Sequence, residues 1–191
     1  MPSKRPFRAA CALLGSVAIA GPISAQTHQH AIALTDAPAS SRPAPAGPEV
    51  FENLSRQPGI VEIELVASPA KLTLVPGRST DAYAYNGRVP GPRLEVREGD
   101  RVIVHFRNDL PDSTTVHWHG LHLPVAADGS PFHPVAPGES RDFEFTIRPG
   151  SAGTYWYHPH PHHRTGWQVA KGLYGAVIVR DPDDPLAHLP E

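Results

Sequence analysis

The chain has 191 residues, enough for one well-packed domain and too few for two domains of ordinary size. Its formal net charge is −2, from 17 basic and 19 acidic residues with histidine counted as neutral. A slightly acidic chain has no general attraction for nucleic acid or anionic lipid, so we expect neither as a partner.

The first 25 residues have the features of a secretory signal peptide. Three basic residues precede an apolar run over residues 9–20, and the small-residue exit Ile23-Ser24-Ala25 follows. The run is too short to span a membrane. The stretch SKRPFRA is similar to a twin-arginine signal with lysine in place of the first arginine, which leaves the export route open. We therefore predict a periplasmic or secreted protein of 166 residues, with a formal charge of −5 after cleavage.

The single cysteine, Cys11, lies inside this predicted signal. The mature chain would then hold no thiol, which excludes a disulfide framework and a thiolate metal site. A blue-copper electron-transfer site needs a cysteine thiolate, so a stand-alone carrier of that class is excluded as well.

Residues 26–55 are predicted to form a flexible lead segment, because they are rich in alanine and proline and show no period of 2 or 3.6. Residues 56–181 are predicted to form the folded domain, and residues 182–191 an interdomain linker cut short. Within the domain, only residues 165–173 suggest a short helix. Short alternating runs, separated by proline and glycine, occupy residues 61–65, 71–75, 81–85, 93–100, 101–109, 140–147 and 175–182. Strands spaced about 8–12 residues apart favour an all-β antiparallel sandwich or barrel.

Histidine is concentrated in the two segments TTVHWHGLHLP and YWYHPHPHHRTGWQVAKG. On a strand, His117 and His119 would point to the same face, about 6.6 Å apart along the chain. His158 and His160 repeat this spacing, although the proline after each of them argues against a central ladder strand there. If the two segments are neighbours, both pairs can converge on one metal-binding site.

The aromatic surroundings support a metal site, because polar groups among large aromatic side chains are costly unless they are paired or bound to metal. An all-imidazole set suits zinc, copper, nickel or iron, and copper(II) has the highest affinity among the divalent ions. Zinc stays open on chemistry alone. A cupin also begins with His-x-His, but residues 120–124 lack the carboxylate expected there.

The motifs HWHGLHLP, ADGSP, PGES and GTYWYHPHPHHRTGWQVAKGLYGAVIV, in this order, resemble the N-terminal cupredoxin domain of the multicopper oxidases. This family contains laccases, bilirubin oxidases and bacterial periplasmic cuprous oxidases, and the third group is the most similar in the second histidine motif. The resemblance covers residues 60–181 and implies a single cupredoxin-like domain, a Greek-key β-sandwich or barrel.

The resemblance also implies roles for individual residues. The first histidine of the HWHG motif binds the type 2 copper, which matches His117, and the second binds the type 3 pair, which matches His119. His158 and His160 match further type 3 ligands. Asp128 matches an acidic residue that assists proton delivery during oxygen reduction, although an aspartate before glycine is also a common turn residue.

The other histidines match no ligand position that the resemblance requires. His105 and His133 are predicted to be ordinary strand or loop residues. His162 could orient a ligand or shape a path for copper. Trp118, between two predicted ligands, is expected to point to the opposite face and pack in the core.

The implied function is an oxidoreductase that couples one-electron oxidation of a small reducing substrate, such as cuprous ion or a phenol, to reduction of dioxygen to water. The family's trinuclear copper cluster needs eight histidines, half from the last domain, and a late His-Cys-His segment for the type 1 copper. This sequence holds half of the ligands and no such segment. We therefore predict the N-terminal part of a longer oxidase, inactive alone. The alternatives are a periplasmic copper-binding module without catalysis, or a subunit completed by another chain.

Overall fold

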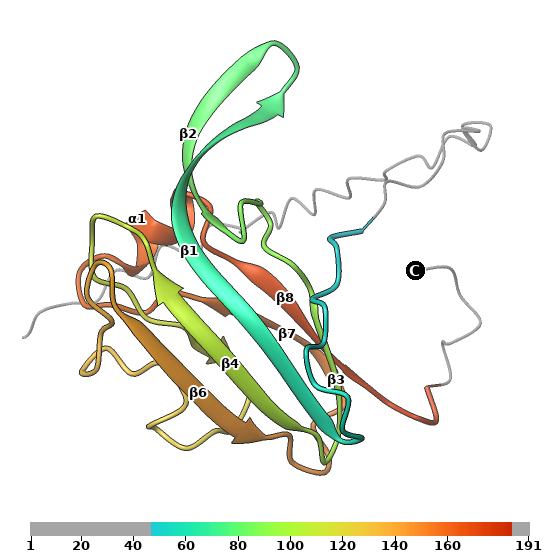
Figure 1. The fold of residues 1–191 in the computed structure, drawn as a ribbon. Coiled ribbons are helices and arrows are strands. Elements are labelled where there is room, and N and C mark those ends of the chain that lie inside the picture. The colour runs from blue at the N-terminus through green and yellow to red at the C-terminus, as the bar shows by residue number, and fades with distance from the viewer. Residues whose placement is uncertain (1–46, 185–191) are drawn as a thin grey trace, which may run out of the picture. The chain divides into compact units, whose positions relative to one another are not determined.

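The computed structural model describes residues 47–184, so the predicted signal peptide and much of the predicted lead lie outside the described residues. The described chain forms two four-stranded sheets that share one core (Figure 1). The elements are β1 Ile60–Val75, β2 Arg78–Tyr85, β3 Leu94–Arg97, β4 Arg101–Asn108, β5 His117–His119, β6 Ser140–Thr146, β7 Gly153–His158, α1 Thr165–Ala170 and β8 Gly175–Arg180. Within residues 47–184, no helix is long and apolar enough to cross a bilayer.

The strand order is β2-β1-β4-β6 in one sheet and β3-β8-β7-β5 in the other. The all-β prediction is confirmed, but the expectation of purely antiparallel sheets is wrong, because β1–β4 and β3–β8 are parallel pairs. The reason is the crossing of the chain between sheets. After β1 and β2 the chain enters the second sheet as β3, and it returns as β4 beside β1.

The two runs predicted at residues 61–65 and 71–75 form one continuous strand, β1, which includes Pro69. The first half of β1 pairs with β4 up to Ala67, whereas the second half pairs only with β2, as a hairpin that extends beyond the sheet (Figure 1). Proline lacks a backbone N–H and is tolerated where a strand has one neighbour. Pro69 lies in this one-neighbour half, so it does not interrupt the strand.

The core is built from inward-facing residues of both sheets. Ile63 and Leu65 of β1 are fully buried, as are Val104 and Phe106 of β4. Before β1, the backbone N–H of Phe51 donates to the Arg93 carbonyl (3.0 Å), and the Phe51 ring packs against the core. The packed part of the chain therefore includes residues that precede position 56.

Candidate metal centre

The two histidine segments are neighbouring antiparallel strands. In the β5–β7 pair, His117 lies directly opposite His158, and Trp118 lies opposite Tyr157. Directly opposite residues share a face of the sheet, and successive residues alternate between faces. Trp118 and Tyr157 are both fully buried, as expected for Trp118, so the histidines occupy the face that points away from the core.

Three of the four predicted ligands have ring nitrogens close enough together to bind one metal ion. One ring nitrogen from each of His117, His119 and His158 lies within 4.8 Å of the others. The His160 ring lies beside them, with its centroid 5.2 Å from that of His117 and 6.0 Å from that of His158. The structure thus brings the four predicted residues together, with His160 just past the end of β7.

The hydrogen bonds of these rings determine which nitrogens are free to bind a metal. His158 Nδ1 lies 2.8 Å from the Pro159 carbonyl oxygen, which can only accept, so Nδ1 donates and Nε2 carries the lone pair. That Nε2 lies 3.1 Å from His119 Nδ1. His117 directs Nδ1 to the Asp128 carboxylate, which leaves the Nε2 atom of His117 available to bind a metal ion. A set of imidazoles with converging ring nitrogens fits a copper or zinc ion.

His158 is the most enclosed member of the group, with 5% of its surface exposed. The Trp156 ring stacks on it, with ring centroids 4.0 Å apart and planes 28° from parallel. Burial lowers the pKa of His158 to about 4, and the nearby imidazoles of His117, His119 and His160 act in the same direction. His158 is therefore neutral near pH 7, the form that binds metals.

Asp128 contacts His117 through its carboxylate, at Oδ1, and more distantly through its backbone carbonyl oxygen, which lies 3.3 Å from His117 Nδ1. Its Oδ1 accepts hydrogen bonds from His117 Nδ1 (2.9 Å) and from the backbone N–H of Trp118 (3.3 Å). The neighbouring Gly129 has a φ of +59°, and a Cβ there would lie 1.9 Å from the Val116 carbonyl oxygen. Glycine at this position thus allows the loop to approach the start of β5 closely enough to bring Asp128 to His117.

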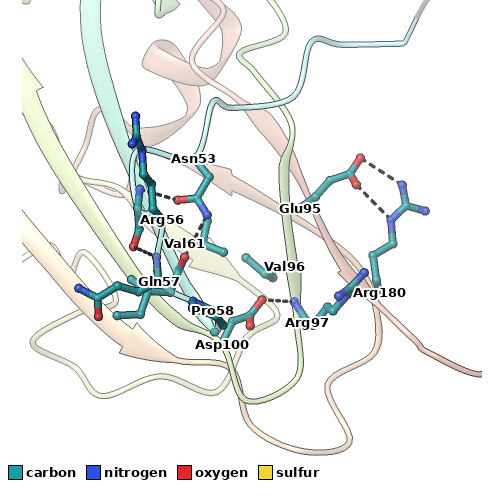
Figure 2. A pocket seen from close by; sticks show the side chains of 13 residues that line it. Asn53, Arg56, Gln57, Pro58, Val61, Glu95, Val96, Arg97, Asp100 and Arg180 are labelled. Atoms are coloured by element: carbon teal, nitrogen blue, oxygen red, sulfur yellow. Dashed lines mark hydrogen bonds and ion pairs between the residues drawn. The ribbon is translucent and has the colours of Figure 1, made fainter.

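A small cavity of about 230 Å³ adjoins this side of the site, and its lining includes His117, Asp128, Ser130 and His160. A larger cavity, about 460 Å³, is lined by residues such as Asn53, Arg97, Asp100 and Arg180 (Figure 2). Arg180 ends β8, whereas Tyr157, next to His158, pairs with the first residue of β8. The larger cavity therefore lies at the opposite end of that sheet from the histidines.

Within residues 47–184, the other histidines lie outside the ligand group. His105 is on β4 in the other sheet, where its Nε2 and Nδ1 each lie 2.9 Å from a carboxylate, those of Glu62 and Asp142. The pKa of His105 is raised by its hydrogen bonds to Glu62 and Asp142. His162 is exposed, and its ring contacts that of Phe132 at a centroid distance of 5.3 Å.

The contacts that several residues make with the centre were not predicted from the sequence. These residues are Thr115, whose hydroxyl accepts from the His160 backbone N–H, the stacked Trp156, and Pro159, through its carbonyl. Trp156 and Pro159 lie inside the second histidine motif, but their contacts depend on ring orientation. Thr115 is two residues before His117, and no local signal marks its partner 45 residues away.

A family model described as "Multicopper oxidase" matches residues 67–184. The chain belongs to the multicopper oxidase family. It is 36% identical over 134 residues to the multicopper oxidase of Staphylococcus epidermidis, covering 70% of this chain and 30% of that protein. It is 33% identical over 157 residues to a copper resistance protein A homologue of Pseudomonas syringae, covering 81% of this chain and 24% of that protein.

Solved structures of the family share the fold. A multicopper oxidase from Campylobacter jejuni, described as a metallo-oxidase, is similar with a TM-score of 0.72 and 42% identity, covering 75% of this chain and 31% of that one. A laccase from Pediococcus acidilactici has a TM-score of 0.71 and 31% identity, covering 76% and 32%. These matches confirm the cupredoxin domain and imply copper binding. The chain spans about a third or less of the length of these proteins.

Proposed function

We propose that this chain is the N-terminal copper-binding domain of a laccase-like multicopper oxidase. His117, His119, His158 and His160 would supply half of the ligands of a trinuclear copper cluster, with His117 on the type 2 copper and the other three on the type 3 pair. The observation that carries the proposal is the convergence of three of these imidazoles, His117, His119 and His158, whose ring nitrogens lie within 4.8 Å of one another, with the His160 ring beside them. Another cupredoxin domain, in the same chain or a second one, would supply the rest.

Bound copper would accept electrons one at a time and pass them to dioxygen. The protein's own contribution is to hold neutral imidazoles in a fixed geometry. Because the pKa of the buried His158 is lowered, a proton does not compete with the metal for this imidazole at neutral pH. Asp128 orients His117 through Oδ1, and as a carboxylate beside the small cavity it would also hold and release the protons that oxygen reduction consumes.

The wider setting of the reaction belongs to the same proposal. We expect dioxygen and a small reductant, cuprous ion or a phenol, as the substrates, and a periplasmic or secreted location. Relatives named copper resistance protein A support copper as the resident metal and agree with cuprous ion as a reductant.

The test is copper binding by the 191-residue chain. Cu²⁺ is added at pH 7.5 in competition with a chelator of known affinity, and Trp156, stacked on His158, provides a fluorescence signal that bound Cu²⁺ quenches. We expect His117→Ala and His158→Ala to weaken Cu²⁺ binding by at least about a hundredfold. Loss of a residue that only orients a ligand costs about 10- to 100-fold in metal affinity, and each of these variants removes a ligand itself. His105→Ala, which changes a histidine of the other sheet, serves as the control and should bind as the wild type does.

Two results would contradict the proposal. Equal Cu²⁺ affinity of the wild type and the His117→Ala and His158→Ala variants would mean that the ligands lie elsewhere. Copper-dependent oxidation of a phenolic dye by the purified chain alone would refute the half-site argument.

A copper-binding module without catalysis is the second candidate, favoured by the three nitrogens within 4.8 Å, which suffice to hold one ion without help. The gene sequence separates the two functions. A His-Cys-His segment downstream or in an adjacent gene supports the oxidase, and its absence from both places supports the module.

A further inference from the structure

Three fully buried polar side chains lie behind the metal centre: Thr114, Thr115 and Gln168. Gln168 is the buried residue of α1, a position where an apolar side chain would ordinarily face the core. A buried amide is costly unless its donors and acceptors are satisfied. The question is therefore what these buried hydrogen bonds hold in place.

Gln168 joins α1 to the segment that leads into β5. Its Oε1 accepts a hydrogen bond from Thr114 Oγ1 (2.8 Å), and its Nε2 donates to the Ser113 carbonyl (3.0 Å). The same amide thus contacts two consecutive residues of this segment. Because β5 begins three residues after Thr114, the position of the amide bears on where His117 enters the sheet.

Thr115 joins that segment to the second histidine motif. Its Oγ1 accepts from the backbone N–H of His160 at 2.8 Å. The β5–β7 ladder pairs His117 with His158, and extending its register by two residues would place Thr115 opposite His160. β7 has already ended at His158, so the threonine hydroxyl takes the place of a ladder carbonyl.

We propose that Thr115 and Gln168 are positioning residues of the copper centre. Thr115 holds the main chain at His160, and Gln168 holds the segment that carries Thr115, so that the His160 imidazole stands beside His117 before any metal arrives. The inference rests on the proposed function and extends it, because it assigns the placement of one ligand to side chains that touch no metal. Loss of partners that orient ligands typically lowers metal affinity by about 10- to 100-fold.

The central test compares Thr115→Val with Thr115→Ser in the full chain. Valine keeps the branched shape of threonine and lacks the hydroxyl, whereas serine keeps the hydroxyl. We expect Thr115→Val to raise the Cu²⁺ dissociation constant about tenfold or more and to change the Cu²⁺ electron paramagnetic resonance spectrum. Thr115→Ser should stay within about threefold of the wild type, because it retains the acceptor for His160.

A double-mutant cycle shows whether Thr115 acts through His160. If it does, Thr115→Val should have no further effect on Cu²⁺ affinity in a His160→Ala background. Gln168→Met has a side chain of similar length that cannot form the two hydrogen bonds. It should likewise weaken Cu²⁺ binding in the wild-type background and have no further effect in the His160→Ala background. It provides a second variant if Thr115→Val folds poorly. Val104→Ala, a truncation in the buried part of β4, is the control for lost stability and should leave Cu²⁺ affinity unchanged.

The outcomes separate the positioning role from a purely structural one. Lower melting temperatures of Thr115→Val and Gln168→Met with wild-type Cu²⁺ affinity and spectrum would overturn the proposal. Additive losses of affinity in the His160→Ala background would overturn it as well. Failure of the wild-type chain to bind Cu²⁺ would refute the proposed function itself, whereas tight binding by wild type and Thr115→Val alike would refute the positioning role alone.

Discussion

Substitution of Asp128 by alanine and by asparagine separates the two roles proposed for this carboxylate. Oδ1 accepts hydrogen bonds from His117 Nδ1 and from the Trp118 backbone N–H, and it is the nearer of the two Asp128 oxygens to His117 Nδ1. Asparagine keeps an oxygen in the place of Oδ1, so it can accept both bonds, but it cannot exchange a proton. Alanine removes the carboxylate acceptor and leaves His117 Nδ1 only the longer contact with the backbone carbonyl oxygen of residue 128 (3.3 Å), so the ring is held less firmly.

The size of the effect follows from the shorter bond. His117 and Asp128 have 22% and 28% of their side chains exposed, so the bond is partly screened by water. A hydrogen bond to a charged group contributes about 1.5–3 kcal/mol, and loss of a residue that orients a ligand costs about 10- to 100-fold in metal affinity. We therefore expect Asp128→Ala to raise the Cu²⁺ dissociation constant about 10- to 100-fold. Neutral hydrogen bonds are roughly half as strong, so Asp128→Asn should cost about 3- to 10-fold.

The assay is chelator competition at pH 7.5 on the 191-residue chain, with wild type and both variants measured side by side. Wild-type affinity of Asp128→Ala, within about twofold, would refute the orienting role. Equal losses in the two variants would show that the charge, and not the position of Oδ1, is what matters. In a completed oxidase, proton delivery by Asp128 predicts that Asp128→Asn slows oxygen reduction far more than it weakens copper binding.

Three other predictions concern stability. Gly129→Ala places a Cβ 1.9 Å from the Val116 carbonyl oxygen, so the free energy of unfolding of this variant in urea should fall by about 2–5 kcal/mol. The control is Gly150→Ala, where φ is +79° but no atom lies close, and it should lose only about 1–2 kcal/mol. Equal losses in the two variants would contradict the contact with Val116. The pKa of His158 is lowered from 6.5 to about 4, so between these pH values the unfolded chain binds a proton at this residue and the folded chain does not. The free energy of unfolding of the metal-free protein should therefore fall by up to about 3 kcal/mol as the pH drops from 6.5 to 4. His158→Asn should reduce this loss of stability at low pH. The raised pKa of His105 acts in the opposite sense, since the stabilisation from His105 is present below pH 6.5 and is lost as the pH rises through the pKa of His105 in the folded chain. Addition of Cu²⁺ to a hundredfold excess over its dissociation constant should stabilise the chain by about 2.7 kcal/mol in thermal unfolding, and a chelator should reverse this; the same shift in a variant without the four histidines would mean binding elsewhere.

The strands could largely be predicted from local pattern. Alternation over residues 101–109 and 140–147 corresponds to β4 and β6, and the short helical signal to α1. The continuity of β1 through Pro69 could not be predicted, because it depends on the strand having one neighbour there. The parallel pairs β1–β4 and β3–β8 depend on which sheet the chain enters next, and local alternation carries no information on that choice.

For the site, the period of two along a strand was enough to place His117 and His119 on one face, and the motif pattern predicted the four histidines and Asp128 as site residues. The pattern could not show that His158 would lie opposite His117, that the backbone N–H of His160 would donate to Thr115, or that Gln168 would be buried behind them. These relations join residues 41 to 55 positions apart in the chain.

The amino-acid sequence by itself determined the residue types of the candidate site: two His-x-His pairs, each with the spacing of an extended strand, set in the motifs of one oxidase family. The residue types and their spacing along a strand are local properties, and they persist whatever the rest of the chain does. Only the tertiary structure decided which nitrogens face one another and which are engaged by Asp128 and Pro159. It also decided which buried side chains hold the ligand segments, because hydrogen bonds between residues far apart in the sequence, such as His119 with His158 and Thr115 with His160, exist only once β5 and β7 lie side by side.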